Sequence, residues 1–132
     1  MLSLYAVSKF VLYCAVCFAL AISFRLQLDS RWNFSITWGA ARLGLGLLFG
    51  YPIALLYFGL LNSHTSATAS YLIAFVPIRI VEWAILFALI ARRHRIPWGI
   101  RANAWVLGGA AVSILTDGLA ILAGADRIKI FC

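Results

Sequence analysis

Charged residues are scarce in this sequence. Only 11% of the 132 residues are charged and four are acidic, whereas soluble domains carry about 25% charged residues. No polar or Pro/Gly/Ser-rich linker divides the chain, and three cysteines are too few for a disulfide framework. We therefore expect a single domain over residues 1–132. A soluble globule is excluded, because too little polar surface is available to cover it.

The residue patterns of enzymes and metal sites are also missing. His64 and His94 fall on opposite sides of the expected bundle, so they cannot share a metal or a haem. Cys14 and Cys17 lie in an apolar run without the context of a redox motif, which favours plain apolar packing. Ser113 has no His or Lys nearby to act as its base. We expect no catalytic residue, no metal and no cofactor.

Long apolar runs are what the sequence has in abundance. Hydrophobic residues make up 64% of the chain and the mean hydropathy is +0.99. Chains in lipid must satisfy their own backbone hydrogen bonds, and continuous apolar runs favour helices over a barrel. About 20 residues cross a bilayer, so the uncharged stretch 43–78 must break, and its only polar cluster is 62–66. The pattern predicts an all-α integral membrane four-helix bundle, with transmembrane helices at about 5–24, 38–61, 70–91 and 102–124.

The distribution of cations predicts the orientation of this bundle. Two of the expected connections lie on one side and carry six arginines: Arg25, Arg31, Arg92, Arg93, Arg95 and Arg101. Such cations mark the cytoplasmic side, so both termini are expected outside, in a bacterial-type plasma (inner) membrane. The net charge of +7 is thereby attributed to topology, and a nucleic-acid partner is not expected.

Two further expectations concern the helix ends. An alternative interpretation treats the first helix as a cleaved signal peptide, with a small-x-small site at residues 19–21. Only Lys9 precedes its apolar core, whereas signal peptides begin with a cationic region, so a retained helix is favoured. Lys9 and Arg42 lie near expected helix ends, and both are expected to snorkel to the headgroups.

Three charges fall inside the expected spans. Arg79 and Glu82 lie in the third helix and Asp117 in the fourth. Each would cost about 2.5–3.5 kcal/mol at mid-membrane if uncompensated. Arg79 and Glu82 share a helix face, and Asp117 has a similar depth. We expect an Arg79–Asp117 pair with Glu82 alongside, buried between these helices. The net charge of this trio is −1, which an extra proton, a cation or a partner's arginine could complete.

Small residues predict where helices approach closely. Gly46 and Gly50 form a small-x-x-x-small motif in the second helix, and Gly109 and Ser113 form a stripe in the fourth. For the second helix, packing on a neighbouring helix of the bundle is favoured over a dimer seam.

Arg92, Arg93 and Arg95 follow the third expected helix as a cluster. Beyond their role in topology, they are candidates for binding anionic lipid headgroups. Membrane lipids are thus expected partners.

These features favour one class of function over two others. The leading interpretation is a non-catalytic subunit or accessory protein of a larger membrane assembly, and not an enzyme. The alternative is a small homo-oligomeric transporter or channel, in which Glu82 and Asp117 bind cations or protons and Arg79 is their counter-ion. A weaker alternative is an anionic-lipid-binding membrane protein.

Overall fold

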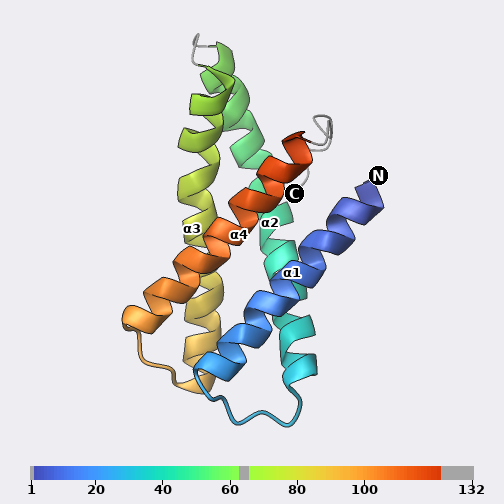
Figure 1. The fold of residues 1–132 in the computed structure, drawn as a ribbon. Helices are drawn as coiled ribbons and strands as arrows, with labels where there is room; N and C mark the ends of the chain where they lie inside the picture. The colour runs from blue at the N-terminus through green and yellow to red at the C-terminus, as the bar shows by residue number, and fades with distance from the viewer. Residues whose placement is uncertain (1, 63–65, 123–132) are drawn as a thin grey trace.

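The described residues fold into four long helices. These helices run alternately up and down (Figure 1). The computed structural model describes residues 2–62 and 66–122, with side chains described for 5–60, 66 and 69–119. The helices are α1 (Leu2–Ser23), α2 (Arg31–Asn62), α3 (Ala67–His94) and α4 (Ile100–Leu122). Segments 24–30 and 95–99 lie at the same end of the bundle, which we term the connection end. The expected all-α four-helix bundle is therefore present.

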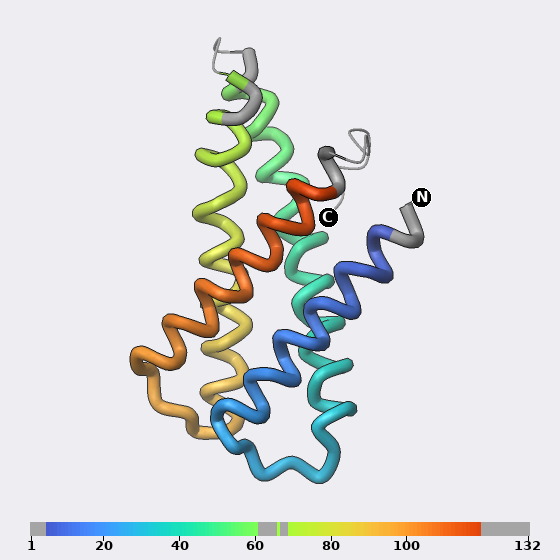
Figure 2. Tube along the Cα trace, in the orientation of Figure 1, coloured from blue at the N-terminus to red at the C-terminus, as the bar shows by residue number. Residues whose placement is uncertain are grey.

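Three of the helices are long and apolar enough to cross a bilayer. These candidate spans are Tyr5–Ser23, Arg31–Leu60 and Ala69–His94. The described part of α4 carries Asn103 and Asp117 and does not belong to this set. In the view of Figure 2, α1 and α4 are inclined relative to the α2–α3 pair.

The start of α2 differs from the expected one. The helix was expected from residue 38 but begins at Arg31. The hydroxyl of Ser30 accepts a hydrogen bond from the backbone N–H of Asn33, at 3.3 Å, and thereby caps the helix. Phe34 is buried, with its ring 5.5 Å from that of His94. Polar and aromatic residues in such a mixture also occur in loops at the headgroup level, whereas here they form the capped first turns of α2, which have a buried face.

The main core lies between all four helices. Trp83 of α3 is fully buried at its centre, with Tyr13 of α1 and Trp105 of α4 packed edge-on at 5.6 and 5.1 Å. A second, smaller cluster is built from α2 and α3 alone, around Ile53, Ala74 and Phe75. The bundle is thus held by one four-helix core and one two-helix core.

Candidate functional site: a buried ion network

The three charges expected inside the bundle do come together. Arg79 donates through Nη1 to Oε2 of Glu82, at 2.9 Å, and through Nη2 to Oδ2 of Asp117, at 3.0 Å. All three side chains are buried, and Asp117 is the most exposed of them at 7%. The i, i+3 spacing on α3 places Arg79 and Glu82 on one face, and α4 brings the second carboxylate. The predicted Arg79–Asp117 pair is present.

Two more cations belong to the same cluster, and sequence reasoning missed both. Lys9 of α1 lies with Nζ 2.5 Å from Oδ1 of Asp117, and Arg42 of α2 lies with Nη2 2.5 Å from Oε2 of Glu82. Their exposed fractions are 1% and 0%, so the expectation that they snorkel to the headgroups was wrong. Lys9, Arg42, Arg79, Glu82 and Asp117 form what we term the ion network. Every helix of the bundle contributes at least one member to it.

Gly46 explains why the Arg42 guanidinium can turn into the bundle. This glycine lies one turn beyond Arg42 on α2, and a Cβ there would be 3.4 Å from Nη1 of Arg42 and 3.9 Å from Nη1 of Arg79. Its missing side chain makes room for two guanidinium groups. The role predicted for Gly46 was close helix packing, whereas its Cβ position faces the ion network.

The charge balance of the network differs from the expected one. Among the described residues, three cations surround two carboxylates, so the net charge of the ion network is +1 with all of these groups ionised. The trio expected from sequence had a net charge of −1 and required a proton, a cation or a partner's arginine. The missing positive charge comes from Lys9 and Arg42 of the same chain. Each carboxylate is therefore paired with two cations.

Hydroxyl groups and aromatic rings complete the surroundings of the network. Tyr5 and Tyr71 donate to the two oxygens of Asp117, at 2.7 and 3.2 Å. The Arg42 guanidinium lies 4.9 Å from the centre of the Tyr13 ring and 5.1 Å from that of Trp83. Desolvated contacts between a cation and a ring are worth about 2 kcal/mol. These contacts help to offset the cost of burying Nε and Nη1 of Arg42, which have no hydrogen-bond partner among the described residues.

The small residues of α4 lie where the predicted packing needs them. A Cβ on Gly109 would lie 2.6 Å from Cε3 of Trp83, so the indole ring rests on this glycine. The indole N–H donates to Oγ of Ser113, at 2.9 Å. Both residues thus seat Trp83 beside the ion network. Gly50 is half-buried, and its packing role stays a prediction.

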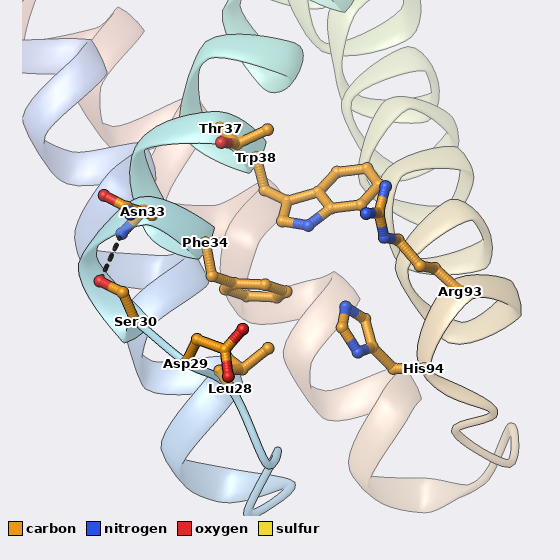
Figure 3. Close-up of a pocket in the computed structure, with 9 residues that line it drawn as sticks. All are labelled: Leu28, Asp29, Ser30, Asn33, Phe34, Thr37, Trp38, Arg93 and His94. Carbon is orange, nitrogen blue, oxygen red and sulfur yellow. Dashed lines mark hydrogen bonds between the residues drawn. The ribbon is translucent and has the colours of Figure 1, made fainter.

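The arginines predicted to bind lipid lie at the connection end. Arg92, Arg93 and Arg95 are exposed, and the first two occupy the last turn of α3, where cations complement the helix dipole. A hollow of about 310 Å³ lies between the start of α2 and the end of α3. Figure 3 shows Arg93 and His94 on one side of this hollow and Asp29 below Phe34.

The described residues contain no group of three His, Cys, Asp or Glu side chains that could hold a metal ion. His94 lies at the connection end, whereas His64 lies outside the described residues.

Comparison of the chain with protein-family models, with curated proteins and with solved structures found no match. The site itself therefore carries the functional argument.

Proposed function

We propose that this chain is a four-span integral membrane protein, with both termini outside, that acts as a non-catalytic subunit or accessory protein of a larger membrane assembly. Three candidate spans support the placement in a bilayer. The alternation of the helices supports a fourth crossing by α4, because segments 24–30 and 95–99 lie at one end with six arginines in or beside them: Arg25, Arg31, Arg92, Arg93, Arg95 and Arg101. These cations favour a cytoplasmic connection end.

The observation that carries this proposal is the internal neutralisation of both buried carboxylates. Glu82 and Asp117 each have two cationic partners within the chain. A network of this kind ties helices together and fixes their register. The buried charge thus serves the fold, and contacts with other molecules fall to the outer faces of the helices.

Two outer faces suit contact with another transmembrane helix. On α2, Ala40 and Gly44 are exposed one turn apart, and on α4, Ala104 and Gly108 repeat this spacing. A Cβ at Gly44 or at Gly108 would have no atom within 4 Å. Small residues at this spacing let helix backbones approach closely in lipid. These faces differ from the inward stripes around Gly46 and Gly109.

The charge balance of the ion network argues against the alternative function, a transporter or channel in which Glu82 and Asp117 bind cations or protons. A cation or proton bound at Glu82 or Asp117 would enter a cluster that already has an excess positive charge. At an effective dielectric constant of 20, two like charges 4 Å apart repel by about 4 kcal/mol. Such a site would require that Lys9 or an arginine first move away.

The test is affinity purification of the tagged full chain in a mild detergent, followed by mass spectrometry. A stoichiometric companion should be recovered with the unmodified chain and lost with Gly44→Leu or Gly108→Leu. Gly59→Leu is the matched control, because it is the same substitution at another open position on α2. Recovery of only the chain itself, or of a companion insensitive to these substitutions, would contradict the proposal.

A further inference from the structure

Helices α1 and α3 end in the same unusual way. Each of these helices is followed by an arginine in the left-handed conformation: Arg25, the second residue after α1, with φ 49°, and Arg95, directly after α3, with φ 54°. The next backbone N–H bonds back five residues, from Leu26 to Ala21 and from Ile96 to Ala91, each at 3.0 Å. This is the helix-ending motif in which the left-handed position is usually glycine. The chain has ten glycines, but neither of these positions is one of them.

Arginine is unfavourable for the backbone at such a position. In the left-handed conformation a Cβ comes too close to the following carbonyl oxygen, and glycine, which has no Cβ, avoids this cost. The apolar residues that follow, Leu26 and Ile96, pack against the core and account for the motif itself. Nothing in the motif requires arginine. Unfavourable backbone conformations of this kind gather at functional sites.

Both arginines line one hollow at the connection end. This hollow, which we term the arginine hollow, has a volume of about 430 Å³. It is lined by residues 24–27 and 94–97. Among these described residues there is no carboxylate. Asp29 instead lines the neighbouring hollow of Figure 3, which shares only His94 with this one. Two arginines and a glutamine thus line a hollow to which the described residues contribute no acid.

We propose that the arginine hollow binds a phosphate ester, and that its occupant is the headgroup phosphate of an anionic phospholipid. Guanidinium groups donate two parallel hydrogen bonds to phosphate oxygens, which makes arginine the preferred partner for this geometry. A volume of this size accommodates small ligands. The inference rests on the proposed placement of the connection end at the cytoplasmic headgroups. It moves the lipid site predicted at Arg92, Arg93 and Arg95 towards Arg25.

Glycine substitution separates this proposal from a structural role. In lipid-free detergent, the Arg25→Gly/Arg95→Gly chain should unfold at a higher temperature than the unmodified chain, because the backbone strain is removed. Stabilisation by added phosphatidylglycerol, measured by thermal unfolding, should need at least about tenfold more lipid, because the charged hydrogen-bond donors to the phosphate are removed. A gain in stability together with a loss of lipid response is the expected signature.

The control is Arg31→Gln/Arg92→Gln, which removes the same charge from exposed residues outside the arginine hollow. It should change the phosphatidylglycerol requirement less than about twofold, because long-range attraction is screened within about 10 Å at 0.1 M salt. An equal loss in both double variants would mean that only the overall charge attracts lipid, and would overturn the site. A lower stability of the glycine variant without lipid would also overturn it.

Two further probes identify the source of the phosphate. Phosphatidylcholine should stabilise the chain less than phosphatidylglycerol, and inorganic phosphate or glycerol phosphate at millimolar concentration should have little effect. A full response to soluble phosphate, lost in the glycine variant, would overturn the lipid as occupant. All of these measurements use the purified chain in detergent, so they stand even if affinity purification finds no companion.

Discussion

Asp117 is the residue whose neutralisation should damage the bundle most. Its carboxylate pairs with Lys9 and Arg79 and accepts hydrogen bonds from Tyr5 and Tyr71. In Asp117→Asn, the amide oxygen can still accept a hydrogen bond, but its negative charge is gone. The three buried cations of the ion network then have only the carboxylate of Glu82 within it, and Lys9 loses its ion pair with Asp117.

The expected cost follows from this count of charges. Leaving a buried charge uncompensated costs about 3–5 kcal/mol, whereas neutral hydrogen bonds in membrane bundles average only about 0.6 kcal/mol. Asp117→Asn should therefore lower the free energy of unfolding by about 3 kcal/mol or more. Arg79→Leu should cost less, because Lys9–Asp117 and Arg42–Glu82 remain as two neutral pairs.

The assay is reversible unfolding of the purified chain in mixed micelles, followed by circular dichroism. Lys9→Met alone should lower the free energy of unfolding only slightly. Combined with Asp117→Asn, it should restore about 1–3 kcal/mol of the free energy lost in that variant, which is the range of coupling between residues in contact. Additive effects of the two substitutions, within about 0.5 kcal/mol, would show that this ion pair contributes nothing. A larger loss for Arg79→Leu than for Asp117→Asn would refute the charge count itself.

Two other predictions test the packing and the orientation. Gly109→Ala forces a methyl group into the ring of Trp83 and should lower the free energy of unfolding by about 1–3 kcal/mol in the same assay. Gly108→Ala, one residue away in open space, should leave this free energy unchanged or raise it. Equal effects of the two substitutions would contradict the close contact between Gly109 and Trp83. In a chain without its native cysteines, Asp29→Cys should react only with a membrane-permeant thiol reagent and Ser66→Cys with an impermeant one, and the reverse pattern would overturn the orientation.

The arrangement of helices could be predicted from the sequence because the apolar runs and their polar breaks have the length scale of a bilayer. The pairing of Arg79 with Asp117 could be predicted for a related reason. Charges deep inside an apolar run have no route to water, so they must find each other. The start of α2 could not be predicted in this way, since a capped helix and a headgroup loop are built from similar polar and aromatic residues.

Lys9 and Arg42 were missed because cations near helix ends can usually reach the headgroups. The signal that they do not lies in their neighbours. Tyr5, Lys9 and Tyr13 follow one another at four-residue intervals, so Lys9 lies on an aromatic face of α1. Similarly, Gly46 stands one turn beyond Arg42 and leaves space on the inner side. Neither pattern is conclusive without knowledge of which face of each helix is buried.

The ion network also determines how the helices depend on one another. Within α3, Arg79 and Glu82 neutralise each other, so this helix can enter a bilayer without net buried charge. By contrast, α1 and α2 each bring one cation, and α4 brings the one further carboxylate. Without α4 the first three helices would hold three cations against a single acid. Adding α4 lowers this excess to one cation and pairs Lys9 and Arg79 with Asp117, so the shared ion pairs tie the four helices into one cooperative unit.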